Sequence, residues 1–147
     1  RAHETLTALG KEVGIDFDFA AIKIGPNTMD AHRLLLWAHT EGREIQDKVV
    51  TALFKANFEE GKNVGDHAVL LDIAEKAGLD KEMIARLLAS DADREMIVTE
   101  IDSAKQMGVN GVPFFIFEHQ YAVSGAQTPD VLAGALREIA TLKAQAQ

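Results

Sequence analysis

The sequence contains no cysteine among its 147 residues. Disulfide bonds, thiolate metal sites and catalysis by a thiol of this chain are therefore excluded. A chain without cysteine is compatible with a reducing cytosol, and we expect a cytoplasmic location. About half of the residues are apolar and a quarter are charged, which is ordinary for a globular protein with a substantial core.

Positive charge is scarce, because 15 Lys and Arg residues face 23 Asp and Glu residues and the formal net charge is -8. Nucleic acids and anionic membranes bind clustered cations, so we expect neither as a partner. Long apolar runs are absent as well, and none approaches the length of a membrane span.

Motifs for metal binding, phosphate binding and nucleophilic catalysis are weak. His32 and His39 lie seven residues apart and can share a helix face, but no third ligand has a suitable spacing. Ser124 has no His–Asp setting around it, and there is no Gly-rich phosphate loop. We therefore predict no metal site, no resident cofactor and no catalytic residue in this chain.

The middle of the sequence predicts a compact array of helices. Apolar residues recur at helical spacing in five segments, most of which end at a Gly residue and begin at an Asp or Asn residue. The predicted segments run from Asn27 or Thr28 to about Thr40, from about Ile45 to Gly61, from Asp66 to Gly78, from Asp80 to about Leu88, and from about Asp91 to Met107.

Three aromatic side chains of these segments are expected to pack in the core. Phe54 and Phe58 lie one helical turn apart, a spacing more typical of packing than of a ligand-binding stripe. Trp37, the single tryptophan, is likewise expected to pack and not to hold a ligand.

Two short strands follow the helices. Phe114–Phe117 is fully apolar and predicts a strand buried on both faces. Pro113 fits the first position of a strand, where a missing N–H is tolerated. After the polar connection 118–120, Tyr121–Ser124 can return beside the first strand as a hairpin.

A final helix is predicted from Pro129 to about Lys143, with Thr128 as its N-cap. A two-stranded hairpin is marginal without further strands or a packed helix. The sheet therefore looks incomplete, and its other strands would come from absent N-terminal residues or from another chain.

The beginning of the sequence also has a helical pattern. Leu6, Leu9 and Val13 follow helical spacing, and no capping residue precedes them. This start is typical of a fragment, a processed form or a truncated chain, and we expect the sequence to be a piece of a longer protein.

Five segments, spread over nearly the whole sequence, form an ordered pattern. They are Asn27–Leu34, Leu53–Gly61, Ala74–Leu79, Gly108–Phe115 and Tyr121–Gln127. Each is moderately specific, but in this order they resemble the DsbA-like thioredoxin-fold family, specifically its FrnE-type branch. The resemblance implies an incomplete thioredoxin-like fold of the α+β class, mostly α as present. Residues 1–26 would be a remnant helix and connector, 27–107 a helical insert domain, and 108–147 the C-terminal half with its cis-proline loop, hairpin and helix.

The resemblance also implies a binding groove. Val112–Pro113 matches the position of the cis proline of this fold, although local sequence alone favours a trans bond. In the family, the backbone before this proline pairs with a substrate peptide or glutathione, beside the redox cysteines. The residues that the resemblance assigns to the groove are Gly111, Val112 and Pro113, and with them Asn27, His32 and Arg33. A solvated first turn of a helix is the alternative for the last two.

The family's chemistry needs a Cys-x-x-Cys pair with a depressed thiolate pKa at a helix N-terminus. In the family pattern this pair would precede Arg1. The resemblance thus implies a piece of a thiol–disulfide oxidoreductase that is redox-inactive by itself. Its partners would be protein or small-molecule thiols and disulfides, with glutathione as a substrate or ligand.

Two alternatives stay open. Glutathione-dependent 2-hydroxychromene-2-carboxylate isomerases share the fold and use a serine in place of the first cysteine. The stretch Ser124–Thr128 differs from their Trp-Gly-x-Asp-Arg-like segment, which favours the oxidoreductase branch. The second alternative is a non-enzymatic helical interaction or assembly module, which could form a homodimer through the incomplete sheet.

Overall fold

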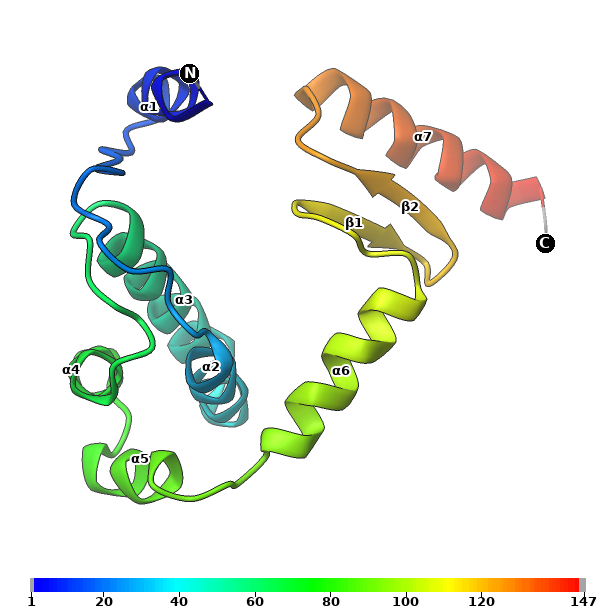
Figure 1. The fold of residues 1–147 in the computed structure, drawn as a ribbon. Coiled ribbons are helices and arrows are strands. Elements are labelled where there is room, and N and C mark those ends of the chain that lie inside the picture. Colours follow the sequence, from blue (N-terminus) through cyan, green and yellow to red (C-terminus); the bar gives the residue numbers. More distant parts are fainter. Residues whose placement is uncertain (1, 146–147) are drawn as a thin grey trace. The chain divides into compact units, whose positions relative to one another are not determined.

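The computed structural model describes residues 2–145, which form seven helices and one β-hairpin (Figure 1). These residues divide into two compact units, the first ending at Val98 and the second starting at Thr99. The division falls inside one helix. None of the described helices is both long and apolar enough to cross a membrane.

The first unit is entirely helical. Its elements are α1 (Ala2–Glu12), α2 (Met29–Glu41), α3 (Arg43–Phe58), α4 (His67–Ala77), α5 (Lys81–Leu88) and the beginning of α6 (Arg94–Gln106).

Local capping chemistry sets the ends of α4 and α5. The Asp66 carboxylate accepts a hydrogen bond from the Ala68 N–H at 2.8 Å, and the Asp80 carboxylate accepts one from the Met83 N–H at 2.9 Å. Each of these bonds satisfies a backbone donor that the first helical turn leaves free. Gly78 follows α4 with a φ of 101°, a left-handed conformation that glycine adopts readily. The predicted starts at Asp66 and Asp80 are confirmed.

Two predicted helix ends are wrong by about one turn. Helix α3 ends at Phe58 and not at Gly61, because the chain turns so that the Lys62 N–H donates to the Ala56 carbonyl at 2.7 Å. Helix α6 begins at Arg94 and not near Asp91. Asp93 has a φ of 59°, which a right-handed helix cannot accommodate.

The core of the first unit lies among α2, α3, α4 and α5. Helix α2 packs against α3 and α4, and α4 packs against α5. Side chains without exposed surface come from each of the four helices: Leu34, Val49, Leu70 and Ile84. Burying each such side chain contributes about 1.5–3 kcal/mol.

The expectation that Phe54 packs in the core is wrong. Its side chain is 60% exposed, whereas Phe58 is half-buried. The core face of α3 carries Val49, Leu53 and Ala56. Phe54 follows Leu53 by one residue, about 100° further round the helix, and therefore points away from the core.

The second unit contains the end of α6, strands β1 (Phe114–Phe117) and β2 (Tyr121–Ser124), and helix α7 (Pro129–Gln145). The strands pair antiparallel, with Phe114 opposite Ser124 and Phe117 opposite Tyr121. The predicted hairpin is thus confirmed in both strands and in their connection.

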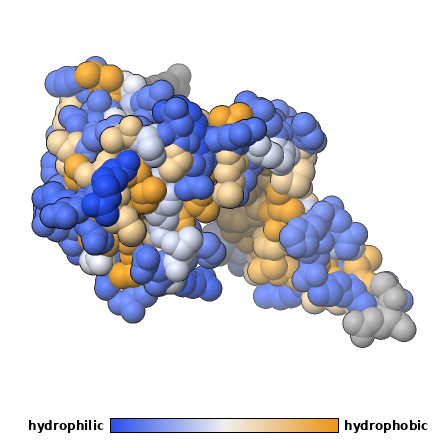
Figure 2. All heavy atoms as spheres, turned by 90° about the horizontal axis from the view of Figure 1, so that it is seen from below, coloured by the Kyte–Doolittle hydropathy of each residue, from blue (hydrophilic) through white to orange (hydrophobic). Residues whose placement is uncertain are grey.

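The predicted burial of β1 on both faces is wrong. Ile116 is 40% exposed, and the three phenylalanines of the strand are only half-buried. The sheet of the described residues has two strands, so both of its outer edges lack a neighbouring strand. Hydrophobic residues reach the surface of both units between hydrophilic ones (Figure 2).

Candidate functional site

The loop before β1 contains the first group of predicted site residues. Gly108 ends α6 with a φ of 88°, and the Val109 N–H donates to the Ala104 carbonyl at 3.1 Å. Gly111, Val112 and Pro113 then follow, all exposed. The peptide bond between Val112 and Pro113 is cis. Val112 is 90% exposed, which makes it the most exposed of the large hydrophobic residues described.

The backbone of this loop is hydrogen-bonded at Pro113 and unpaired at Val112, the residue before it. The Pro113 carbonyl accepts a hydrogen bond from the Gly125 N–H at 2.8 Å, which extends the pairing of the hairpin. The N–H and carbonyl of Val112 make no hydrogen bond with any described residue. One donor and one acceptor therefore stand free at the end of a strand, as an extended peptide requires for backbone pairing.

Asn27 and His32 belong to the first unit and are exposed. The Asn27 side-chain oxygen accepts a hydrogen bond from the Met29 N–H at 3.0 Å, which forms a turn just before α2, whose N-cap is Thr28. His32 lies on the first turns of the same helix. A common groove for these two residues and the Val112 loop stays a prediction.

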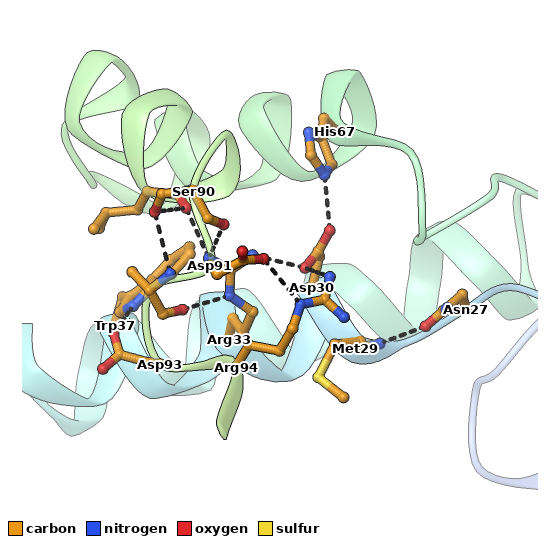
Figure 3. Close-up of polar contacts among 12 residues, drawn as sticks. Asn27, Met29, Asp30, Arg33, Trp37, His67, Ser90, Asp91, Asp93 and Arg94 are labelled. Carbon is orange, nitrogen blue, oxygen red and sulfur yellow. Dashed lines mark hydrogen bonds and ion pairs between the residues drawn. The ribbon is translucent and has the colours of Figure 1, made fainter. Parts of the chain in front are cut away.

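Arg33 is fully buried, and its guanidinium group is surrounded by acceptors (Figure 3). Its Nη1 donates to Asp30 at 2.8 Å. Its remaining bonds go to backbone carbonyls at the end of α5 and in the following loop: Leu87 at 2.7 Å, Ser90 at 2.8 Å and Ala92 at 2.7 Å. The cation thus satisfies carbonyls that the end of a helix leaves free. It ties α2 to the connection between α5 and α6.

Asp30 balances this buried charge. Its carboxylate, 16% exposed, accepts hydrogen bonds from Arg33 and from the His67 Nε2, each at 2.8 Å, and the Arg94 guanidinium lies 3.7 Å away (Figure 3). Burial acts to raise the pKa of Asp30. The hydrogen bonds and charges of Arg33 and His67 outweigh burial together and hold the pKa below its ordinary value.

Trp37 completes the cluster. It is buried, as expected for a packing residue, and its indole N–H donates to the Asp93 carboxylate at 2.8 Å. The Arg33 guanidinium carbon lies 4.9 Å from the centre of the indole ring, within the range of a cation–π contact. Asp93 in its left-handed conformation is thereby held at the start of α6.

This cluster, which we call the Arg33 network, consists of Asp30, Arg33, Trp37, His67, Asp93 and Arg94. Its buried polar groups are paired with one another or with backbone carbonyls, so it forms a structural connection and offers no open position for a ligand. Sequence patterns did not predict this network, because most of the groups that Arg33 and Trp37 bond with lie more than 50 residues further along the chain. The nearest signal is Asp30, three residues before Arg33, at ion-pair spacing on a helix.

Metal-binding groups are not found within residues 2–145, where no three His, Asp or Glu side chains form a suitable cluster. His39 lies 3.2 Å from the side-chain oxygen of Gln46, and His32 is exposed.

Comparison with known proteins places the chain in a family. The model of the DSBA-like thioredoxin domain matches residues 1–137. This chain belongs to that family. A crystal structure of a probable DsbA oxidoreductase from Streptomyces coelicolor is similar, with a TM-score of 0.82 and 30% sequence identity over 93% of this chain. No curated protein matches the sequence.

The DSBA-like chain covers 58% of the length of the Streptomyces protein. Its helices and hairpin are consistent with a DsbA-like thioredoxin fold, as the order of sequence motifs predicts. Because the DSBA-like chain contains no cysteine, thiol chemistry at its surface needs thiols from outside the 147 residues.

Proposed function

We propose that this chain is the cysteine-free, substrate-binding part of a thiol–disulfide oxidoreductase of the FrnE type. The observation that carries the proposal is the state of Val112. This residue is almost fully exposed, its backbone is unpaired, and it lies two residues before the start of β1. Membership of the DSBA-like family supports the same reaction class.

The substrate of this loop is a protein or a small molecule that carries a thiol or disulfide, with glutathione as the simplest case. An extended peptide would donate a hydrogen bond to the Val112 carbonyl and accept one from its N–H. These bonds hold the substrate chain in register while its sulfur meets a thiolate outside this sequence. Gly111, without a side chain, leaves room for the approaching backbone.

Asn27 and His32 are proposed as further contacts of the substrate, because both are exposed. Arg33 receives a different role. Its side chain has no exposed surface and its donors are used within the first unit, so a substrate would reach it only by breaking the Arg33 network. We therefore assign Arg33 to positioning α2.

Nuclear magnetic resonance of the isotopically labelled chain tests the loop directly. Adding glutathione disulfide, or a short peptide with a blocked cysteine, should shift the amide signal of Val112 and slow its hydrogen exchange. Val112→Pro should weaken this binding several-fold with little loss of stability, because it removes the unpaired N–H of an exposed residue. Val131→Ala, at another exposed valine of the second unit, is the control and should leave binding unchanged.

Two results would overturn the proposal. One is an unchanged Val112 amide at millimolar concentrations of both ligands. The other comes from the encoding gene, where a Cys-x-x-Cys upstream of Arg1 is expected. A serine there without cysteine would replace the oxidoreductase assignment with the isomerase alternative.

Self-association of the second unit is a separate proposal. Ile116, Val131 and Leu136 are exposed apolar residues of this unit, and both edges of the hairpin lack a further strand. A second copy could cover them by pairing strand to strand. Light scattering after size-exclusion chromatography should then give twice the mass of the chain, and a clean monomer at high concentration would contradict it.

A further inference from the structure

Helix α3 carries an apolar face that its core contacts do not explain. Phe54 and Phe58 lie one turn apart on the side of α3 away from Val49 and Ala56. The residues of this face share the spacing of one helical stripe: Thr51, Phe54, Lys55, Phe58 and Glu59. Together they form one wall of a pocket.

The pocket, which we call the Phe54 pocket, lies within the first unit and has a volume of about 530 Å³. Its other wall comes from α1 and the segment that follows it, through Leu6, Ile15, Phe17 and Phe19. Leu6, Ile15 and Phe54 are all exposed large hydrophobic residues. Three exposed apolar side chains therefore gather around a single concavity, which is typical of a binding site and not of scattered surface residues.

Backbone contacts hold the two walls in place. The Asp18 N–H donates to the Phe58 carbonyl at 2.8 Å, which fixes the segment after α1 to the end of α3. The Ile15 N–H donates to the Gly10 carbonyl at 2.8 Å. A Cβ atom at Gly10 would lie 2.6 Å from the Phe17 ring, so glycine is what allows this ring to approach α1.

The aromatic rings of the pocket are already paired with one another. Phe17 stacks on Phe19 with centroids 5.1 Å apart, and Phe54 stacks on Phe58 at 6.1 Å. The His3 ring also stacks on Phe19, with ring centroids 4.4 Å apart. The rings thus offer a continuous apolar surface, which suits a flexible alkyl chain better than one additional flat ring.

The polar groups of the pocket stand at its rim. Lys55 is exposed and makes no ion pair with any described residue, although the nearby Lys48 is paired with Glu44 at 2.8 Å. Thr51, one turn before Lys55, has a hydroxyl without a partner among the described residues. A cation and a hydroxyl donor side by side suit a carboxylate. Glu59, one turn after Lys55, would repel an anion placed on its side.

We propose that the Phe54 pocket binds a small alkyl carboxylate. The alkyl chain lies among the phenylalanine rings, Leu6 and Ile15. The carboxylate meets the Lys55 ammonium and the Thr51 hydroxyl, on the side away from Glu59. The pocket belongs to the first unit, so this proposal does not depend on peptide binding at Val112.

Titration calorimetry with octanoate and 1-octanol separates the two parts of the site. The two molecules have eight carbon atoms each, and only octanoate is charged. Octanoate should bind more tightly. Lys55→Gln should raise its Kd about two- to fivefold, the range of an exposed ion pair, and leave 1-octanol unaffected. Lys48→Gln on the same helix is the matched control and should change neither Kd.

Two further variants test the walls and the charges. Phe54→Ser should weaken both ligands about equally and keep the fold, since Phe54 is 60% exposed. Glu59→Gln should lower the Kd of octanoate and leave that of 1-octanol unchanged. Because this variant gains binding, it still tests the proposal if Phe54→Ser does not fold. Amide shifts at Thr51, Lys55 and Phe58 on adding octanoate place the ligand.

Three results would overturn the proposal. The first is the absence of saturable octanoate binding. The second is equal binding of octanoate and 1-octanol that Lys55→Gln does not change, which would make the pocket a non-selective apolar surface. The third is a dimer that Phe54→Ser dissociates, which would assign the pocket to contact between two copies of the chain.

Discussion

The two units bury their apolar side chains to very different degrees. In the first unit, α2, α3, α4 and α5 surround a core in which several side chains have no exposed surface. In the described part of the second unit, only Ile139 is buried. The phenylalanines of β1 are half-buried, and Met107, Val112 and Leu136 are exposed.

This difference supports the proposal that the first unit is a framework and that the second carries a binding surface. In the first unit, buried polar groups bond with other groups of the same unit, as in the Arg33 network. The second unit leaves a strand edge, a loop backbone and apolar side chains accessible. Such groups are the ones that a substrate peptide or a further strand can use. We therefore expect substitutions of buried residues in the first unit to act on stability. Substitutions in the second unit, like those at the Phe54 pocket, should act mainly on binding.

The largest effect is expected from Arg33→Ala. The substitution removes one donor from each of three backbone carbonyls and leaves the Asp30 carboxylate without its main partner. Breaking a buried ion pair from one side costs about 3–5 kcal/mol of unfolding free energy. Urea unfolding followed by circular dichroism measures this loss.

Arg86→Ala is the control for this prediction. Arg86 is an exposed arginine of α5 without an ion pair among the described residues, and its loss should change stability by less than about 0.5 kcal/mol. Equal effects of the two variants would mean that the Arg33 network does not stabilise the first unit. Amide protection of the hairpin, measured in parallel, shows whether the second unit loses stability at the same time.

A somewhat smaller effect is expected from a matched pair of leucines. Leu70→Ala, at a side chain with no exposed surface, should cost about 2–5 kcal/mol, because it removes buried methyl groups and leaves a cavity. Leu136→Ala on α7 should cost less than about 1 kcal/mol, since this side chain is half exposed. Fluorescence of Trp37, the single tryptophan, follows the first unit, and amide signals of β1 and β2 follow the second.

Equal costs at Leu70 and Leu136 would contradict the comparison between the units. They would indicate that something covers α7 in solution. A second copy of the chain is the first candidate, and the concentration dependence of the Leu136→Ala effect would identify it.

Local chemistry explains why much of the fold is predictable from the sequence. Asp66 and Asp80 mark helix starts because their carboxylates bind backbone N–H groups two and three residues further on. The hairpin follows from two short strand-forming runs with a polar break. In each case the deciding contact joins residues that are close in the sequence.

Burial and the buried polar contacts were not predictable in the same way. Phe54 has the spacing of a core residue, yet its side of α3 faces a pocket. Arg33 bonds with carbonyls 54 to 59 residues further on, which no local pattern indicates. The Val112 loop was found from an ordered set of family motifs, whereas the Phe54 pocket has no sequence motif.

The smallest predicted effect is a dependence on pH. The folded-state pKa of Asp30 is lowered, so its contribution to stability is complete above the ordinary Asp pKa of 3.8 and is lost as the pH falls through the folded value. The stability difference between the wild type and Asp30→Asn should therefore be constant above about pH 5 and shrink as the pH falls further. Urea midpoints at several pH values measure it.

Glu118→Gln in the second unit provides the contrast, because the Glu118–Lys143 ion pair at 2.9 Å is about half exposed on both sides and is expected to contribute about 0–1 kcal/mol. If both differences stay constant with pH, the Asp30 carboxylate is not stabilised by the Arg33 network, and the two units do not differ in how they hold their charges.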